Sequence, residues 1–291
     1  MFPRVTRWAE LLLCNFCNEP MKNSDRNTVS SVPSPEGASI VVPCCNEEAG
    51  LCLLDRRLSN LRALLAPKYE MEFILVDDGS TDRTWTLMNE IFRKQRDVTL
   101  LQHGTNRGIG AAILTGIRAA QTEIVCSIDS DCSYDPCELA RMIPMLAAGV
   151  DLVTASPYHP QGQVLNVPWW RLILSKTASR LYQQVLQQHL HTYTSCFRVY
   201  RRSAILKLVL KREGFLAVSE LVAKLDQQGS VVLECPVTLA ARVHGVSKMK
   251  TVRVIFGHLQ LLCELLISKM WRAMHRCDAR VASTSLISSQ G

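Results

Sequence analysis

The stretch Glu123-Ile-Val-Cys-Ser-Ile-Asp-Ser-Asp131 joins a short apolar run directly to two carboxylates. A run of this length with β-branched residues is typical of a buried strand. The same pattern occurs earlier in the chain, where the apolar run Glu72-Phe-Ile-Leu-Val76 is followed directly by Asp77-Asp-Gly-Ser-Thr-Asp82. We therefore expect buried strands whose carboxyl ends carry acidic side chains.

Outward from these two stretches, strand and helix patterns alternate, which predicts an α/β fold with a central, mostly parallel sheet flanked by helices. Ligands of such sheets bind outside the carboxyl ends of the strands, where the polar clusters of this chain occur. Strands are expected at 39–43, 72–76, 98–102, 123–128, 151–155, 194–200 and 231–235. Helices are expected at 51–65, 83–94, 106–120, 168–188, 219–227 and 252–271.

The length of 291 residues suits one large α/β domain. We expect a flexible extension over residues 1–37, the main domain over 38–250, and an amphipathic helix with a tail over 251–291. The formal net charge of +7 favours anionic partners such as phosphates or acidic lipid, and we expect no nucleic-acid partner. The twelve cysteines form no framework of spaced pairs, which indicates reduced thiols in a cytosolic protein.

The cluster Asp129-Ser130-Asp131 is the most informative one. Two carboxylates one residue apart after a buried strand can reach one cation through a turn. Mg²⁺ prefers few carboxylates together with phosphate oxygens and water. A divalent metal, Mg²⁺ or Mn²⁺, held by Asp129 and Asp131 would neutralise the charge that builds on a departing diphosphate. The alternative is that both side chains only cap the next helix.

A second acidic cluster lies at Asp77-Asp78. We expect Asp78 to point toward the ligand, while Asp82 caps the following helix. The nearby segment Asn106-Arg-Gly-Ile-Gly110 lacks the third glycine of a dinucleotide-binding fingerprint, because residue 113 is Ile. This segment therefore does not predict a dehydrogenase.

A basic loop comes late in the chain. Arg242 and Lys248 lie on either side of a glycine, and such a loop can fold over phosphate groups. The alternative is a solvated basic loop in front of the last helix.

Taken together, six motifs resemble those of family 2 glycosyltransferases, in particular the branch of dolichyl-phosphate mannose synthases and polyprenyl-phosphate glycosyltransferases. The likeness covers about residues 39–250. It implies a GT-A fold and an inverting transfer of a sugar from a nucleotide-sugar donor. The motifs are Pro43-Cys-Cys-Asn-Glu47, Val76-Asp-Asp-Gly-Ser-Thr-Asp82, Asn106-Arg-Gly108, Asp129-Ser-Asp131, Thr194-Ser-Cys-Phe-Arg198 and Arg242-Val-His-Gly-Val-Ser-Lys248.

The resemblance assigns a role to each matched position. It implies that Asp129, Ser130 and Asp131 contact the diphosphate and the metal. Ser195 and Arg198 would lie toward the acceptor, and Arg242 and Lys248 would hold phosphate. The nucleobase and the ribose would be held by Pro43, Cys45, Glu47, Val76 and Asp78.

The chain also departs from the family pattern at four positions. The family usually has Tyr at Cys45 and Gly at Cys196, often a metal-ligating Gln at Ser133, and commonly an Arg at Pro157. These departures leave the donor sugar and the base open.

The acceptor decides whether a catalytic base is needed. A phosphate acceptor is already an anion and needs none, whereas a hydroxyl acceptor normally does. Basic residues near the acceptor side favour a polyprenyl phosphate. The alternative is a hydroxyl of a lipid, glycan or protein, with Glu220 as the base. An alternative of another class is an inactive nucleotide-sugar-binding scaffold, against which the retention of Asp129, Asp131, Arg242 and Lys248 argues.

The helix expected at 252–271 bears on membrane association. Its interior charges cost about 2.5–3.5 kcal/mol each at the centre of a bilayer, so we expect no transmembrane helix. Its apolar face predicts an amphipathic helix in the membrane interface, with Trp169, Trp170 and Arg171 as a second contact. The expected location is the cytoplasmic face of a membrane, peripherally associated. The alternative is that the helix packs against the main domain or a partner subunit.

Overall fold

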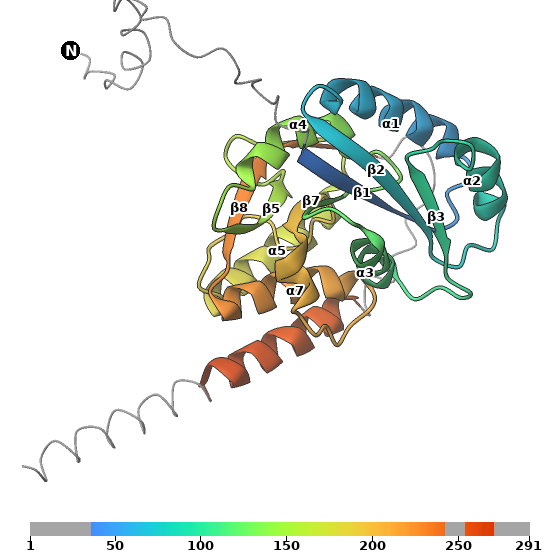
Figure 1. Ribbon diagram of the computed structural model, residues 1–291. Coiled ribbons are helices and arrows are strands. Elements are labelled where there is room, and N and C mark those ends of the chain that lie inside the picture. The colour runs from blue at the N-terminus through green and yellow to red at the C-terminus, as the bar shows by residue number, and fades with distance from the viewer. Residues whose placement is uncertain (1–35, 242–253, 271–291) are drawn as a thin grey trace, which may run out of the picture. The chain divides into compact units, whose positions relative to one another are not determined.

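The computed structural model describes residues 36–241 and 254–270 (Figure 1). Within these residues the main sheet has the strand order β3-β2-β1-β4-β7-β5-β8, and β6 pairs with β9 in a small second sheet. The strands of the main sheet are β1 (Glu36–Cys44), β2 (Tyr69–Asp77), β3 (Val98–Gln102), β4 (Ile124–Ser127), β5 (Val150–Ser156), β7 (Arg198–Arg201) and β8 (Val231–Pro236). The small sheet consists of β6 (Gln163–Leu165) and β9 (Thr238–Ala240).

The helices confirm the expected alternation in the earlier half of the chain. There α1 (Leu51–Leu65), α2 (Thr84–Phe92) and α3 (Ile109–Ala119) separate the first four strands. The later helices include α5 (Trp169–Val185) and α7 (Phe215–Gln228). The shorter ones are α4 (Leu139–Met142) and α6 (Arg202–Leu206), with 3₁₀ turns at Pro136–Glu138 and Ile143–Met145.

The sheet is parallel except at one strand. β1 pairs in parallel with β2 and β4, and β2 with β3, whereas β7 runs antiparallel to both β4 and β5. The carboxyl ends of β1, β2, β3 and β4 therefore meet at one edge, as the alternation predicts. The expected strand at 194–200 begins only at Arg198.

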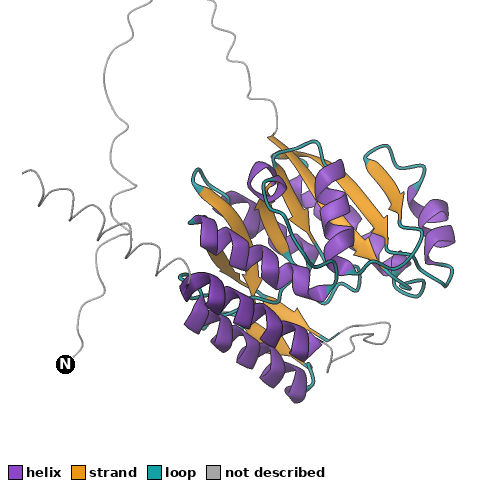
Figure 2. Ribbon diagram, turned by 90° about the horizontal axis from the view of Figure 1, so that it is seen from below, coloured by secondary structure: helices purple, strands orange, loops and turns teal. Residues whose placement is uncertain are grey.

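Two apolar cores cover the two faces of the sheet, because successive strand residues point to opposite sides. Ile40 and Val42 of β1 belong to the core under α1, α2 and α4, whereas Val41 belongs to the core under α3, α5 and α7. The views from two directions show these helices on the two sides of the sheet (Figure 1, Figure 2). Because both faces of the sheet are buried, the strand sequences are continuous apolar runs.

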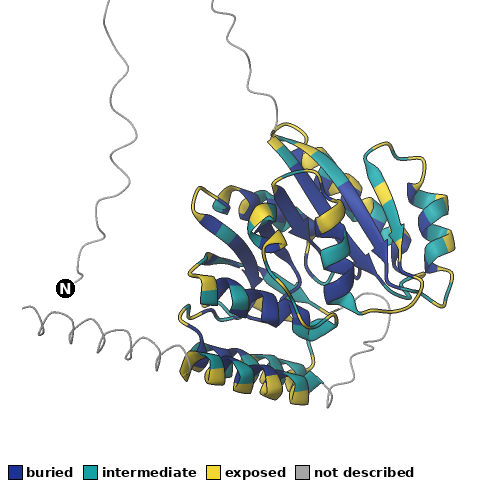
Figure 3. Cartoon of the chain, turned by 60° about the horizontal axis from the view of Figure 1, so that its bottom comes forward, coloured by how far each residue is buried: buried dark blue, intermediate teal, exposed yellow. Residues whose placement is uncertain are grey.

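Helix 254–270 packs against the second core. Leu261, Leu262 and Leu265 are buried in that core, while Phe256 (68% exposed) and Met270 are exposed. Figure 3 shows that the helix has a buried side toward the domain and an exposed side away from it. The sequence predicts a single apolar face, and that face proves to be mainly the exposed one. The helix therefore has a second apolar side, which packs against the domain.

The limits of the described residues leave two expectations open. The divisions at 37/38 and 250/251 fall near or beyond those limits and stay predictions. Among the described residues, no helix is long and apolar enough to cross a membrane.

Candidate active site

A cavity of about 930 Å³ opens at the carboxyl ends of β1, β2 and β4 and continues between α5 and helix 254–270. We call its two parts the donor end and the acceptor end, after the substrates that the resemblance implies for them. The donor end is polar and is lined by Pro43, Cys45, Glu47, Asp78, Asn106 and the segment 129–131. The acceptor end is mainly apolar and is lined by Leu174, Ala178, Leu181, Ile255 and Leu259, and Arg171 and Ser195 also line the cavity. Most of the predicted site residues thus share one cavity.

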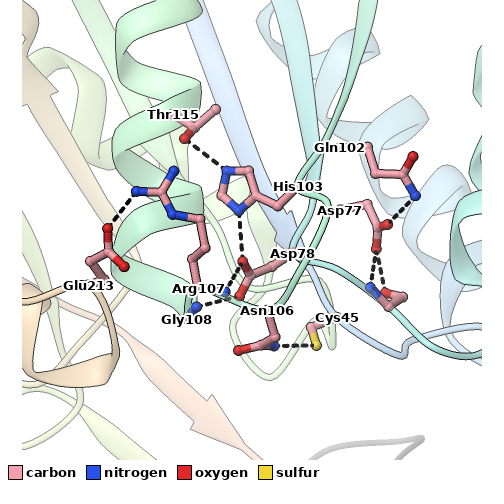
Figure 4. Close-up of polar contacts among 11 residues, drawn as sticks. Cys45, Asp77, Asp78, Gln102, His103, Asn106, Arg107, Gly108, Thr115 and Glu213 are labelled. Carbon is pink, nitrogen blue, oxygen red and sulfur yellow. Dashed lines mark hydrogen bonds and ion pairs between the residues drawn. The ribbon is translucent and has the colours of Figure 1, made fainter.

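Asp78 follows β2 and is 2% exposed at the wall of the donor end. Its Oδ1 accepts the backbone N–H of Arg107 at 2.9 Å and lies 2.8 Å from Nδ1 of His103. Its Oδ2 accepts the backbone N–H of Gly108 at 2.7 Å. Nε2 of His103 lies 3.0 Å from the Thr115 hydroxyl (Figure 4). Asp78 is therefore fixed by the loop that follows β3.

The loop Asn106–Gly108 also contacts its other neighbours. The Asn106 side chain donates to Cys45 Sγ at 3.1 Å, and Arg107 forms an ion pair with Glu213 (Figure 4). Gly108 has a φ of 96°, and an added Cβ would lie 2.6 Å from Cα of Gly214. Only glycine fits there, which explains the sequence Asn-Arg-Gly at this strand end.

The two carboxylates of Asp77-Asp78 have different surroundings. Asp77 accepts from Ser80 and, at 3.1 Å, from Nε2 of Gln102, and it lies outside the cavity lining. This agrees with the expectation that Asp78 faces the ligand. As expected, Asp82 accepts the backbone N–H of Thr84, the first residue of α2, at 2.9 Å.

Asp129, Ser130 and Asp131 line the cavity just after β4. Oδ1 of Asp131 accepts the backbone N–H of Ser133 at 2.9 Å, and Cys132 between them has a φ of 53°. This turn brings both carboxylates to the same cavity. The described residues contain no group of three or more His, Cys, Asp or Glu side chains suited to hold a metal. Two carboxylates suit a divalent cation such as Mg²⁺, which takes its remaining ligands from water and phosphate oxygens.

Three predicted residues do not lie where the sequence suggested. Arg198 is 0% exposed and donates to the carbonyls of Val218 and Tyr193 at 2.7 and 2.9 Å, so it joins β7 to α7 instead of facing the acceptor. Glu220 is also buried and is discussed with the reaction below. Val76 is fully buried within the second core, because the strand pleat turns it away from the cavity.

Two further predicted residues, Arg242 and Lys248, lie outside the described residues. Ser195 does line the cavity, and its hydroxyl accepts the backbone N–H of Phe197 at 3.2 Å.

Arg171 is a functional candidate that sequence reasoning mentioned only as a membrane contact. It lies in the first turn of α5, and it is the one Lys or Arg of the described residues that lines the cavity. Its guanidinium lies over the Trp170 ring, and its buried Nε has no partner among the described residues. The sequence signal was the pair of tryptophans before it, which suggested a membrane contact and not a cavity wall.

His258 connects helix 254–270 to the cavity wall. Its Nδ1 lies 2.8 Å from the Tyr182 hydroxyl of α5, and burial lowers the pKa of His258 to about 4. The imidazole is therefore neutral near pH 7.

Two of the cysteines that line the cavity, Cys44 and Cys196, could in principle act as nucleophiles. Burial raises the pKa of the Cys44 and Cys196 thiols far above the ordinary range. Because the thiolate is the nucleophilic form, these side chains are unsuited to a covalent step.

The fold has solved counterparts. Glucosyl-3-phosphoglycerate synthase from Mycobacterium tuberculosis, in a crystal structure with Mn²⁺, UDP and glucosyl-3-phosphoglycerate, superposes with a TM-score of 0.59 at 18% identity. The match covers 79% of this chain and 80% of that one. The fold is accordingly the GT-A fold of glycosyltransferases, as the motifs suggested.

Sequence comparison gives the family. The model of glycosyl transferase family 2 matches residues 39–209. The polyprenol monophosphomannose synthase of Mycolicibacterium smegmatis is 34% identical over 72% of this chain and 80% of its own length. The dolichol-phosphate mannosyltransferase of Pyrococcus furiosus is 29% identical over 78% of this chain but 63% of its own length. The chain belongs to glycosyl transferase family 2 and is a glycosyltransferase similar to those that act on polyprenyl phosphates.

Proposed function

We propose that the chain is an inverting, metal-dependent glycosyltransferase that moves a sugar from a nucleotide-sugar donor to a polyprenyl phosphate at a membrane surface. The observation that carries this proposal is the division of one cavity into a polar donor end and an apolar acceptor end. A nucleotide sugar matches the first, and a prenyl chain matches the second.

The donor would bind along the strand ends. Asp78, with Pro43, Cys45 and Glu47, would hold the nucleobase and ribose, while Asp129 and Asp131 would hold a divalent metal, Mg²⁺ or Mn²⁺. When bound, such a cation neutralises charge on the diphosphate leaving group. Arg242 and Lys248 would add phosphate contacts. The carboxylates repel a bare diphosphate, which supports a role for a cation at this end.

The acceptor phosphate would contact Arg171, whose guanidinium can bind two phosphate oxygens at once. The first turn of α5 adds the positive end of a helix dipole. In the reaction, an acceptor phosphate oxygen attacks the anomeric carbon, whose bond to the diphosphate oxygen breaks, and the bonding electrons leave with the nucleoside diphosphate. One displacement of this kind inverts the configuration, and an anionic acceptor needs no base.

A membrane surface is the environment in which a polyprenyl phosphate is available. Trp169 (72% exposed) and Ile173 on α5 are exposed, and so are Phe256, Ile267 and Met270 on helix 254–270. Both helices border the acceptor end of the cavity. We infer that these side chains enter the lipid interface on the cytoplasmic face of a membrane, so that the acceptor passes from the lipid into the cavity.

The hydroxyl-acceptor alternative has less support. Glu220 accepts the backbone N–H groups of Lys211 and Arg212, both at 3.0 Å, and its side chain lies 3.2 Å from Nζ of Lys224. It is buried and is not part of the cavity lining. A base must reach the proton that it removes, and Glu220 is engaged elsewhere.

The experiment is a panel of radiolabelled nucleotide sugars incubated with the full chain, Mn²⁺ and polyprenyl phosphate. We expect an acid-labile lipid product, because a glycosyl phosphate bond is acid-labile. An acid-stable product would instead support the hydroxyl acceptor. Donor binding without any transfer would support the inactive scaffold.

A further inference from the structure

Helix 254–270 is held against the domain along one row of buried side chains. The row consists of His258, Leu261, Leu262 and Leu265, which recur at helical spacing. The three leucines are of one size and shape, so on their own they would let the helix turn or slide against the domain. His258 is the polar member of the row. A buried polar side chain is satisfied in few arrangements, and it can therefore fix the register of a helix.

The partner of His258 is Tyr182 of α5. Nδ1 of His258 lies 2.8 Å from the Tyr182 hydroxyl, and the two rings meet edge to face with their centroids 5.8 Å apart. Tyr182 is fully buried and its ring stacks on Tyr193, which holds the hydroxyl in place. A helix shifted by one residue would bring Gly257 or Leu259 to this hydroxyl. Neither side chain can form the hydrogen bond, and the loss of a buried hydrogen bond is unfavourable.

The adjacent residue, Gly257, specifies the same register on α7. A Cβ added to Gly257 would lie 2.0 Å from Cδ1 of Leu216. The helix therefore approaches α7 closely at this residue. A shift by one position would bring Phe256 or His258 into a space that holds no side chain now. One polar contact and one steric contact thus select a single arrangement of the helix.

This register decides which side chains form the apolar wall of the cavity. Ile255 and Leu259 lie on either side of His258 in the sequence of the helix, and all three line the cavity. A shift by one residue turns the helix by about 100°, which would move Ile255 and Leu259 out of the wall. The acceptor end therefore depends on Tyr182, although Tyr182 itself does not line the cavity.

We propose that the Tyr182–His258 pair positions the lipid acceptor by fixing the register of helix 254–270, so that Ile255 and Leu259 contact the prenyl chain. This inference rests on the proposed function, because it concerns the acceptor of that reaction. Both members of the pair are positioning residues, which act on the prenyl chain through the helix. The pair lies apart from the acidic donor end, so it should affect the acceptor alone.

Tyr182→Phe is the smallest change that breaks the pair, because it removes the hydroxyl and keeps the ring. We expect the KM for polyprenyl phosphate to rise about three-fold to ten-fold, while the KM for the nucleotide sugar stays unchanged. Transfer of radiolabelled sugar by the full chain, with each substrate varied in turn, measures both values. Cys263→Ser, an exposed change on the same helix, is the matched control and should leave both values unchanged.

A second set of variants shows that the hydrogen bond, and not packing alone, is responsible. His258→Leu should raise the acceptor KM as Tyr182→Phe does, and combining the two should add little, because both break the same bond. His258→Asn keeps a polar atom near the position of Nδ1 and should restore most of the acceptor affinity. Additive effects, an equal rise in both KM values, or no difference between His258→Asn and His258→Leu would each overturn the proposal.

Hydrogen exchange of the full chain, followed by mass spectrometry, tests the contact without any substrate. Tyr182→Phe should speed the exchange of backbone amides in helix 254–270 and leave that of α1 unchanged. Unchanged exchange in the helix would overturn the inference whatever the acceptor is. If exchange responds as expected but the wild type transfers no sugar to polyprenyl phosphate, the error lies in the proposed function and not in the contact between the helices.

Discussion

The donor half of the molecule, β1 to β4 with α1 to α3, differs from the acceptor half, α5 and helix 254–270, in what forms the cavity wall. In the donor half the wall is made of polar side chains that stand directly after strands, such as Asp78 and Asp129. In the acceptor half it is made of helix faces, with Leu174 of α5 and Leu259 of helix 254–270. Strand order alone brings the first group together, whereas the second depends on how two helices pack.

The two halves also differ in charge. The donor end has the carboxylates of Glu47, Asp78, Asp129 and Asp131, while Arg171 is on α5, which borders the acceptor end. Both proposed substrates are anionic, so a cation would offset the carboxylates of the donor end. The comparison therefore predicts that metal removal affects the donor and that loss of Arg171 affects the acceptor.

The largest effect is expected from Asp131→Ala. Loss of this carboxylate removes half of the predicted metal site and should lower kcat by about a hundred-fold or more. Transfer of radiolabelled sugar at several Mn²⁺ concentrations measures the change. Asp135→Ala is the matched control, because Asp135 accepts the Cys137 N–H outside the cavity. Full activity of Asp131→Ala would show that the metal assignment is wrong.

Arg171→Ala should act on the acceptor only. Loss of a charge-assisted contact to phosphate should raise the KM for polyprenyl phosphate about ten-fold to a hundred-fold and leave the donor KM unchanged. Arg180→Ala, an exposed arginine on the same helix, serves as the control. An equal rise in both KM values would mean that the two ends of the cavity are not separate sites.

The exposed apolar side chains of the acceptor half should bind lipid. Replacing Trp169 and Phe256 together by Ser should weaken binding to vesicles of anionic phospholipid about ten-fold or more, because each side chain loses its burial in the interface. Flotation of the full chain with vesicles measures this. Leu64→Ser, an exposed residue of α1, should bind as the wild type does. Unchanged flotation of the double variant would place the membrane contact elsewhere.

Glu220→Gln separates stability from catalysis. The amide would direct an N–H toward a backbone donor, which should lower the free energy of unfolding by about 1–3 kcal/mol. Because the side chain lies outside the cavity lining, kcat of the folded variant should stay close to that of the wild type. Urea titration and the transfer assay measure the two quantities. A large loss of kcat at full stability would favour the hydroxyl acceptor.

The smallest expected effect is a loss of stability as the pH falls, which we attribute to His258. Its pKa is lowered to about 4 in the folded chain, so the unfolded chain takes up a proton as the pH falls below about 6.5. Stability is therefore complete above that pH and decreases toward pH 4. The melting temperature of the wild type should fall by a few degrees between pH 7 and pH 5. His258→Gln should show a smaller fall. If the melting temperatures of the wild type and the variant fell equally, groups other than His258 would cause the pH dependence.

The same contrast explains what the sequence could predict. The first four strands and their helices follow from the alternation of apolar runs and helix patterns. Asp78 follows from a run that ends in carboxylates, and topology then places the strand ends together. The family resemblance implies that Arg198 lies toward the acceptor, and Glu220 is the base of the hydroxyl-acceptor alternative, but both side chains are buried away from the cavity. Their burial depends on contacts with distant segments, such as the Val218 carbonyl for Arg198. Local patterns do not contain that information, nor do they show that helix 254–270 has two apolar sides.

The central claim is that one cavity joins a nucleotide sugar to an anionic lipid acceptor. The most direct measurement compares transfer to a polyprenyl phosphate with transfer to the polyprenol of the same chain length, in the same vesicles. We predict acid-labile product from the phosphate and none from the alcohol. Transfer to the alcohol at a similar rate, giving an acid-stable product, would contradict the account.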